Sequence, residues 1–443
     1  MREMKDSGIE WIDEISLDWT AKPLKWMVKF GKGLPITKDN LIEQGIPVVS
    51  YGQIHSKTND GTHLHDDLIR FVSEAYLESN PLSLGKKGDI FFADTSEDYA
   101  GIGNAVLVDI DTPVFAGYHT VIVRPDDQSY SRYLAYLFLT DAWRSQLCSR
   151  ASGIKVFSIT QGLLKKTTVI LPPAEKAVAM TDYLDRKCSQ IDAIIARQQE
   201  VIEKLKAYKL SVITEAVTKG LNPNVPMKDS GVEWIGEIPV HWDLIKATRI
   251  IISTQNGLSR RDLSKSTGKI VLKLRNISSN GEIDYEYQNR IELTGQELDT
   301  YRLSDGDILF VRVNGSKSLV GKCAIFHSIG EDVAYNDHII RVRISEKCIE
   351  KFFFWYLLSI CGKMEIDLHT STSAGQYTIS GEELRDIRFI LPPKIEQLEI
   401  DRYLSKMSRC IDKIIHQKQI SIDELSAYKK SLIFEVVTGK REV

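Results

Sequence analysis

The sequence has few of the features that mark secreted, metal-binding or membrane proteins. No uninterrupted apolar run comes near the roughly 18 residues that a membrane span needs, and the first residues are charged where a signal peptide is apolar. No cysteine belongs to a CxxC pair, which indicates reduced thiols rather than a disulfide framework or a zinc site. These absences predict a cytoplasmic chain. The six cysteines are Cys148, Cys188, Cys323, Cys348, Cys361 and Cys410.

Signatures of catalysis are also missing. The segment GSKSLVGKC (315–323) lacks the glycine spacing of a P-loop and has cysteine where a hydroxyl should follow the lysine. No GxSxG elbow and no HExxH zinc motif occurs. His63 and His65 stand two apart in a polar stretch, which is more typical of a solvated loop than of a metal site. We therefore expect no catalytic residue and no metal ligand in this chain.

A basic excess, the usual mark of a nucleic-acid binder, is absent as well. The chain has 57 lysines and arginines against 60 aspartates and glutamates, and its formal net charge is −3. Binding to DNA would require the basic residues to gather on one face of the protein. Composition alone leaves the partner open.

One phrase in the sequence occurs twice. Residues 4–19 match residues 227–242 at 11 of 16 positions, and residues 171–218 match residues 391–438. Weaker matches join GDIFFA to GDILFV and GYHTVIVR to NDHIIRVR. A duplication of this length predicts two copies of one structural unit related by approximate symmetry. The intervening segments differ, which favours one frame carrying two specificities over neutral drift of loops.

Each copy has two parts with different patterns. Short apolar runs between turn signals predict mostly strands, with one helix at 131–147 and its counterpart at 350–366. After each LPP, apolar residues alternate spacings of four and three, which predicts a helix of roughly 35 residues, about 50 Å, that pairs with its copy. The positions of this heptad-like seam are Leu184, Cys188, Ile191, Ile195, Gln198, Ile202 and Leu205, then Leu404, Ile411, Ile415, Ile422 and Leu425.

The doubled MKDSGxEWIxEIPxHW phrase, GDILF strand and LPP…YL…ID…AYKxSLIxEVVT helix resemble the specificity subunit of type I restriction–modification systems. The resemblance covers essentially the whole chain, although the first copy departs from the pattern at DEISLDW and GDIFFADTSE. It implies an α+β fold with two pseudo-symmetric mixed α/β target recognition domains, separated by two long helices that form an antiparallel coiled coil. The expected segments are 1–171 (domain 1), 172–218 (central spacer helix), 219–391 (domain 2) and 392–443 (C-terminal spacer helix).

The same resemblance implies a function and partners. Each domain would read one half of a split double-stranded DNA target, and the helices would set the spacing and dock two methyltransferase subunits. Restriction/translocase subunits would join that core. The chain itself would carry no cofactor, while S-adenosylmethionine, ATP and Mg²⁺ would be bound by the partner subunits. A spacer of roughly 50 Å predicts half-sites about 8–13 base pairs apart.

Base readers are expected among polar side chains on loops near strand ends, with aromatic neighbours. The strand-end segments of the two copies supply these candidates, of which Arg275, Arg312 and Lys155 are favoured. The tyrosine and lysine of each AYK triplet are candidates for methyltransferase contact, although helix packing explains the tyrosines almost as well. The DNA-binding candidates are Tyr51, Gln53, His55, Lys57, Thr95, Ser96, Lys155, Phe157, Lys273, Arg275, Asn276, Arg312, Asn314, Lys317, Gln376 and Tyr377, and the partner-binding candidates are Tyr208, Lys209, Tyr428 and Lys429.

Two other functions fit parts of the sequence. A scaffold whose domains bind proteins rather than DNA agrees with the negative net charge, and it predicts no split DNA site. An enzyme that modifies DNA alone predicts methyl transfer by the isolated chain from S-adenosylmethionine. Both alternatives stay open at the level of sequence.

Overall fold

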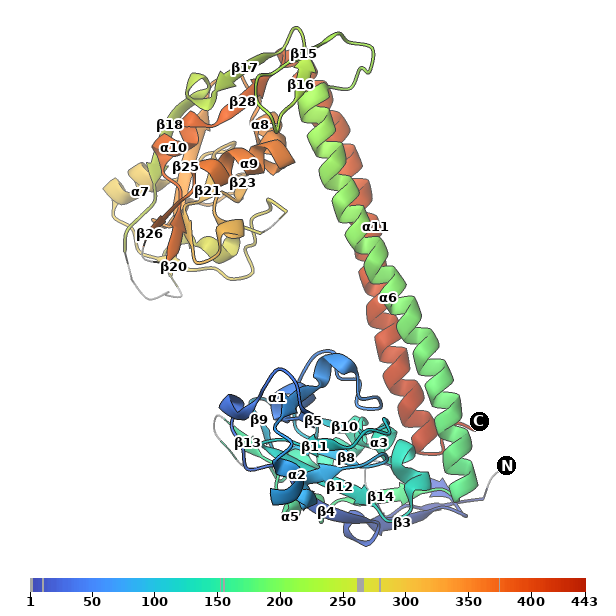
Figure 1. The fold of residues 1–443 in the computed structure, drawn as a ribbon. Helices are drawn as coiled ribbons and strands as arrows, with labels where there is room; N and C mark the ends of the chain where they lie inside the picture. The colour runs from blue at the N-terminus through green and yellow to red at the C-terminus, as the bar shows by residue number, and fades with distance from the viewer. Residues whose placement is uncertain are drawn as a thin grey trace. The chain divides into compact units, whose positions relative to one another are not determined.

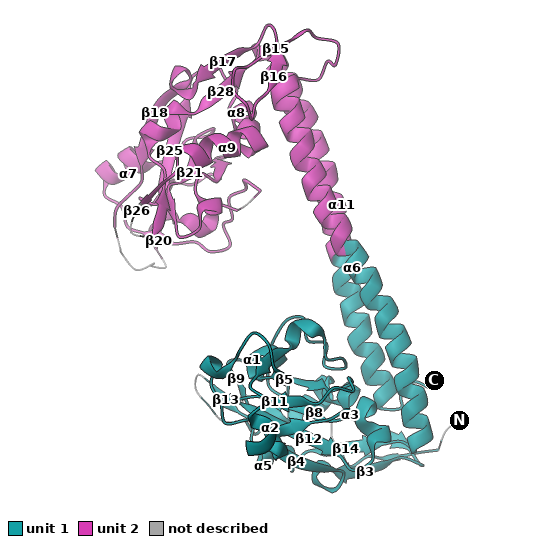
Figure 2. Ribbon diagram, viewed as in Figure 1, with its two compact units in different colours: residues 1–198, 420–443 teal, residues 199–419 magenta. Residues whose placement is uncertain are grey.

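The computed structural model describes residues 3–9, 12–151, 153, 156–260, 267–278, 280–373 and 375–443. The chain divides into two compact units (Figure 2). Unit 1 comprises Met1–Gln198 with Ile420–Val443, and unit 2 comprises Gln199–Gln419. Each unit therefore contains the globular part of one copy of the duplicated sequence and a part of both long helices. Among the described residues, no helix combines the length and apolar character that crossing a membrane requires.

Unit 1 is built on a four-stranded antiparallel sheet. Its central strand, β8, consists of the residues Ile90–Ala93, all of which are buried. Side chains alternate between the two faces of a strand. Ile90 and Phe92 accordingly belong to one apolar core, while Phe91 and Ala93 belong to a second core beyond the sheet. In spatial order the strands are β10 (Ala105–Leu107), β8, β12 (Thr120–Pro125) and β4 (Val28–Lys32).

Unit 1 also contains a second four-stranded sheet (Figure 1). Its middle strands run parallel, with Phe115 opposite Val48, and their neighbours on either side run antiparallel. In spatial order these strands are β6 (Arg70–Val72), β5 (Ile46–Val49), β11 (Val114–Ala116) and β7 (Leu84–Gly85).

Unit 2 repeats this arrangement, as the duplication predicts. Its antiparallel sheet has four strands and its second sheet has three, again with a parallel pair. The register is also the same, because Thr120 lies opposite Ala93 in unit 1 and Ile339 lies opposite Val311 in unit 2. The strands are β18 (Ile251–Asn256), β25 (Ile339–Ile344), β21 (Ile308–Val311) and β23 (Cys323–Ile325), then β20 (Arg290–Ile291), β19 (Lys269–Leu272) and β24 (Val333–Tyr335).

The helix predicted at 131–147 is two helices, and so is its counterpart at 350–366. A hydroxyl residue interrupts each segment and caps the second helix, since a side-chain oxygen there can accept from an N–H in the first turn. Thr140 accepts from the backbone N–H of Trp143 at 3.3 Å, and Ser359 accepts from that of Gly362 at 3.1 Å. The helices are α3 (Ser131–Phe138), α4 (Asp141–Cys148), α8 (Glu350–Leu358) and α9 (Ile360–His369).

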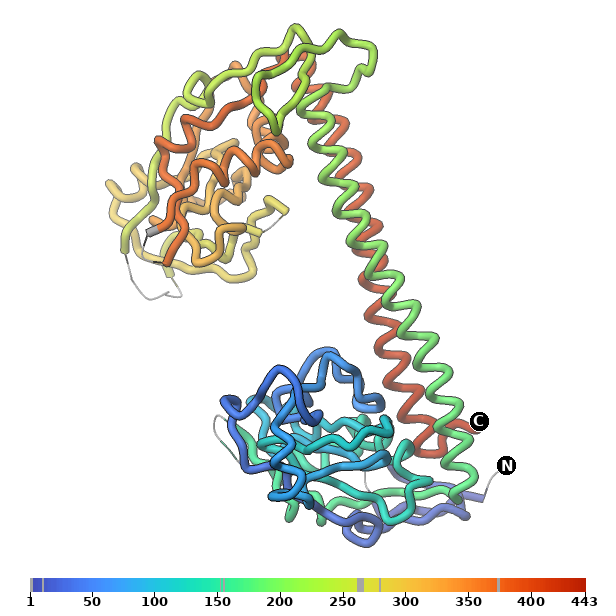
Figure 3. Tube along the Cα trace, viewed as in Figure 1, coloured from blue at the N-terminus to red at the C-terminus, as the bar shows by residue number. Residues whose placement is uncertain are grey.

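The two long helices are longer than predicted and pair antiparallel. Helix α6 (Ala174–Lys219) has 46 residues and α11 (Lys394–Val437) has 44. In unit 1, Leu184 and Ile191 from the first half of α6 share a core with the last turns of α11. In unit 2, the last turns of α6 share a core with Leu404 from the first half of α11. Within each unit the green and red traces accordingly run side by side (Figure 3).

The repeated phrase packs against the end of the other copy's helix. In unit 1, Trp19 shares the core with Val437 at the end of α11, and a Cβ added to Gly439 would lie 3.0 Å from its ring. In unit 2, Trp242 meets Gly220 at the end of α6 in the same way, at 3.1 Å. Both glycines have positive φ, the conformation that commonly ends a helix. The phrase therefore recurs because each copy completes its core with a helix end.

Candidate nucleic-acid interface

Some of the candidates predicted near strand ends come together in a short strand pair in each unit. In unit 1, β9 (Thr95–Ser96) pairs with β13 (Phe157–Ser158), which places Phe157 opposite Ser96. In unit 2, β22 (Val313–Asn314) pairs with β27 (Gln376–Thr378), which places Tyr377 opposite Asn314. Segments that are about sixty residues apart in the sequence thus form one surface in both copies.

In each unit, one of the predicted polar residues stabilises a short helical turn that directly follows a sheet strand. Strand β5 ends before Ser50, and helix α1 (Tyr51–Ile54) follows directly. The backbone N–H of Ser50 donates to Gln53 Oε1 at 3.2 Å. In unit 2 the backbone N–H of Lys273 donates to Asn276 Oδ1 at 2.8 Å, in the equivalent turn. The predicted strands at these two places therefore end earlier than expected, in helical turns.

Asn276 has its hydrogen-bonding capacity committed within unit 2. Its side chain is buried, and Nδ2 donates to the carbonyl oxygens of Asp284 at 2.7 Å and Tyr287 at 3.0 Å. A base reader needs donors or acceptors that face the solvent. The geometry gives Asn276 a role in holding the loop, and DNA contact by this residue stays a prediction.

A cavity of about 650 Å³ opens beside the strand pair of unit 1, and Tyr51, His55, Thr95 and Ser96 line it. His55 Nε2 lies 2.7 Å from the carbonyl oxygen of Thr95, and Asn104 Nδ2 lies 3.1 Å from His55 Nδ1. Ser96 Oγ donates to the carbonyl oxygen of Asp98 at 2.7 Å. His55 and Ser96 therefore hold the wall of the cavity, while Tyr51 and Thr95 are half-buried in it.

The remaining candidates of unit 1 are Phe157, Lys57 and Lys155. The ring of Phe157 packs on Tyr99 with 4.5 Å between centroids. Lys57 is exposed, as a phosphate-contacting lysine must be. Lys155, one of the favoured candidates, lies outside the described residues.

The basic candidates of unit 2 lie in the short connections between its strands, Arg275 and Lys317 in single 3-10 turns. The Arg275 guanidinium lies over the ring of Tyr287 at 5.2 Å, and Lys273 Nζ donates to Asn289 Oδ1 at 2.9 Å. Arg312 Nη1 donates to the carbonyl oxygen of Asp337 at 3.2 Å. Lys317 and Gln376 are exposed. Arginine held by one neighbour and open to solvent on its other donors is suited to a base edge or a phosphate.

Two residues that the sequence analysis did not select lie at the same place in unit 1. Asp94 links β8 to β9, and its Oδ1 lies 3.1 Å from His119 Nδ1. His119 also lines the cavity, and its φ of 55° is rare for a residue other than glycine. The internal duplication could have identified Asp94 as a candidate, because Asp94 aligns with Arg312, which the sequence analysis selected.

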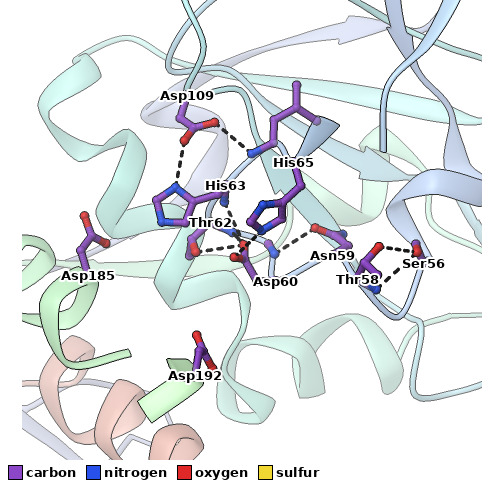
Figure 4. Close-up of polar contacts among 12 residues, drawn as sticks. Ser56, Thr58, Asn59, Asp60, Thr62, His63, His65, Asp109, Asp185 and Asp192 are labelled. Atoms are coloured by element: carbon purple, nitrogen blue, oxygen red, sulfur yellow. Dashed lines mark hydrogen bonds and ion pairs between the residues drawn. The ribbon is translucent and has the colours of Figure 1, made fainter. Parts of the chain in front are cut away.

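The histidine pair of unit 1 is held by carboxylates, as Figure 4 shows. His63 Nδ1 lies 2.9 Å from Asp109 Oδ2, and His65 Nε2 lies 2.9 Å from Asp60 Oδ2. Burial raises the pKa of Asp60, but hydrogen bonds from His65 and from the backbone of Thr62 and His63 outweigh it and lower the pKa. No metal-binding group of three ligands occurs among the described residues.

The AYK triplets place lysine and tyrosine differently. Lys209 Nζ lies 2.7 Å from Asp412 in unit 2, and Lys429 Nζ lies 2.7 Å from Asp192 in unit 1, so each lysine joins the two helices. Tyr208 and Tyr428 are 53% and 49% exposed. Ion pairing between the helices therefore accounts for the lysines, while each tyrosine keeps about half of its surface in solvent.

Comparison with known proteins matches this chain to one protein family. The family model described as the type I restriction modification DNA specificity domain matches residues 16–204 and again residues 258–424. The specificity subunit of the type I restriction enzyme EcoKI from Escherichia coli K12 is 22% identical over 429 residues, which are 95% of this chain and 89% of that protein. The StySPI specificity subunit from Salmonella potsdam is 23% identical over 427 residues, with the same coverage.

A solved structure has the same fold. It is described as the structural basis underlying complex assembly and conformational transition of the type I R-M system. One of its chains superposes with a TM-score of 0.68 at 14% sequence identity, covering 96% of this chain and 98% of that one.

Proposed function

The chain belongs to the family of the type I restriction modification DNA specificity domain, and from this premise we propose that units 1 and 2 each read one half of a split DNA target. The chain is a DNA-recognition subunit, and family membership leaves the protein-interaction scaffold without support. The split target follows from the duplication, because two like frames with unlike loops suit two unlike half-sites.

The matched strand pairs carry this proposal. β9 with β13 and β22 with β27 have the same place in their units, yet their side chains differ. Unit 1 offers Thr95 and Phe157 there, and unit 2 offers Asn314 and Tyr377. A shared frame fixes how each unit lies on the duplex, and the differing side chains provide the difference in sequence.

We propose that the helix pair sets the number of unread base pairs between the half-sites. Helices α6 and α11 each contribute to both units, so their length constrains the two readers through continuous helix. A helix advances about 1.5 Å per residue and a duplex about 3.4 Å per base pair. Lengthening both helices at facing positions should therefore lengthen the gap.

We propose that Tyr208 and Tyr428 form part of the surface that docks two methyltransferase subunits. One tyrosine belongs to each unit, and their equal exposure in equivalent places suits two copies of one partner. Exposed tyrosine is among the residues enriched at protein interfaces. The partners would bind S-adenosylmethionine, ATP and Mg²⁺, and this chain would transfer and cut nothing in the cytoplasm.

The experiment that tests the function is motif mapping. The chain is produced together with the methyltransferase subunit of the same system, and the methylated sites in host DNA are determined by sequencing. We expect one motif with two defined half-sites separated by a fixed number of undefined positions. A continuous motif, or methylation by the chain without its partner, would refute the proposal.

A further inference from the structure

At one equivalent position in the two units, the side chains have opposite charges. Asp94 joins β8 to β9 in unit 1, and Arg312 joins β21 to β22 in unit 2. We infer that Asp94 makes unit 1 select, on the strand that it faces, a base with an exocyclic amino group, which is cytosine through N4 or adenine through N6. This inference rests on the proposed function, because it names what one residue of that interface reads.

The backbone around the two residues is the same. The N–H of Asp94 donates to the carbonyl oxygen of His119 at 3.0 Å, and the N–H of Arg312 donates to that of His338 at 2.8 Å. On the other side, the carbonyl oxygen of Asp94 accepts from Ile159 at 2.7 Å, and that of Arg312 accepts from Ile379 at 3.0 Å.

Both residues are thus fixed between the same two segments of their units. Their side chains leave the backbone at equivalent points of the two frames. The frame is therefore a common scaffold, and the side chain at this position is the part that differs.

The side chains at this position can reach a ligand. Asp94 retains 34% of its side-chain exposure although Oδ1 lies 3.1 Å from His119 Nδ1. Among the described residues, His119 provides the side chain that donates to this carboxylate, which leaves Oδ2 with acceptor capacity. Arg312 is half-buried, and among the described residues its side chain donates through Nη1 to the carbonyl oxygen of Asp337, which leaves its guanidinium with further donor capacity.

The geometry of His119 indicates a built site. Its φ of 55° places it in the left-handed region, where residues other than glycine are strained. Tyr51 meets its ring edge-on at 5.4 Å, and the backbone carbonyl of His119 is the group that holds Asp94. A strained residue held by neighbours on several sides is typical of a functional site.

The chemistry of the base edges decides what a carboxylate selects. In the major groove, guanine presents N7 and O6 and thymine presents O4, and all of these are acceptors that repel a carboxylate. Cytosine N4 and adenine N6 are the amino donors. Arg312, at the same place in unit 2, suits guanine, whose two acceptors match a guanidinium. The opposite charges therefore predict bases of opposite hydrogen-bonding character.

The test compares methylation motifs of the complex of this chain with its methyltransferase. The variants are Asp94→Ala, Asp94→Asn, His119→Asn and Arg312→Ala, with Asp111→Ala as the control. Asp111 is a 90% exposed carboxylate of unit 1, so its removal changes the charge of the unit and breaks one exposed ion pair with Lys87. Arg312→Ala identifies the half-site that belongs to unit 2, because it relaxes one position there.

We expect Asp94→Ala and Asp94→Asn to lower discrimination at one position of the half-site that belongs to unit 1 by roughly 5- to 150-fold. The half-site of unit 2 and the control should stay unchanged. An unaltered motif in both Asp94 variants overturns the inference, and so does complete loss of methylation in both when the control keeps it. If His119→Asn relaxes that position while both Asp94 variants leave it unchanged, His119 reads the base and the inference is wrong.

The failure of the proposed function gives a different result. In that case the wild-type complex itself shows no split motif, whichever residue stands at position 94. A split motif in the wild type that both Asp94 variants leave unaltered refutes only the reading by Asp94.

Discussion

Lys429 of α11 lies 2.7 Å from Asp192 of α6, and this ion pair in unit 1 has a counterpart at the same distance in unit 2 between Lys209 and Asp412. The lysine side chains are 22% and 19% exposed, and the aspartates 49% and 51%. The duplication thus extends to single contacts that fix the antiparallel register of the helices.

These matched ion pairs should contribute equally. We expect a double-mutant cycle with Lys429→Met and Asp192→Asn to give a coupling free energy of about 0.5–1 kcal/mol, because the pair is partly exposed. The cycle with Lys209→Met and Asp412→Asn should give the same value. Urea unfolding at low salt measures both, and high salt should reduce both. A coupling present in one unit only would contradict the equivalence.

The exposed tyrosines should matter for assembly rather than for folding. We expect Tyr208→Ala and Tyr428→Ala each to weaken binding of the methyltransferase subunit by about tenfold, with the free energy of unfolding changed by less than about 0.5 kcal/mol. Analytical ultracentrifugation with the purified subunit measures the binding. Lys204→Ala, at a 73% exposed position of α6, is the matched control. Full affinity in the double variant would place the docking surface elsewhere.

The stability of unit 1 should depend on the ionisation of Asp60. Its pKa is lower in the folded chain than the ordinary value of about 3.9. The ionised Asp60 side chain therefore contributes fully to the free energy of unfolding when the pH is above the ordinary pKa. This contribution is lost as the pH falls through the lower pKa of the folded chain. Asp60 accepts from Thr62, His63 and His65, so we expect Asp60→Asn to reduce the free energy of unfolding by about 1–3 kcal/mol at pH 7.

Urea unfolding at pH 7 and at pH 3 checks this prediction. The difference between the wild type and Asp60→Asn should shrink at the lower pH. Asp111→Asn, which removes a carboxylate of the same unit that is 90% exposed, should show little effect at either pH. If Asp60→Asn lowers the free energy of unfolding by the same amount at both pH values, the charge of Asp60 is not involved.

The duplication predicted the main features of the fold. Repeated phrases indicated two equivalent units, and spacings of three and four indicated paired helices, both of which the structure confirms. The two predicted single helices were wrong because Thr140 and Ser359 read as ordinary helical residues, although both act as N-caps. A cap depends on the local φ and ψ, and periodicity does not report these.

The candidate site was less predictable than the fold. Residue type and position near a strand end selected Arg312 and Asn276 alike, but burial separates them, since Asn276 holds a loop and Arg312 keeps donors free. Burial depends on long-range packing that one sequence does not specify. Asp94 was missed because a carboxylate, considered without the backbone frame that holds it, is repelled by the phosphates of DNA.

The spacing between the half-sites tests the central claim most directly. Seven residues of heptad pattern are inserted after Val201 in α6 and after Gln419 in α11, positions that face each other in the register of the two ion pairs. The insertion adds about 10 Å, which corresponds to at most about three base pairs. The account predicts that motif mapping finds both half-sites unchanged and the gap longer by one to about three base pairs. An unchanged gap, with both half-sites still methylated, would contradict it.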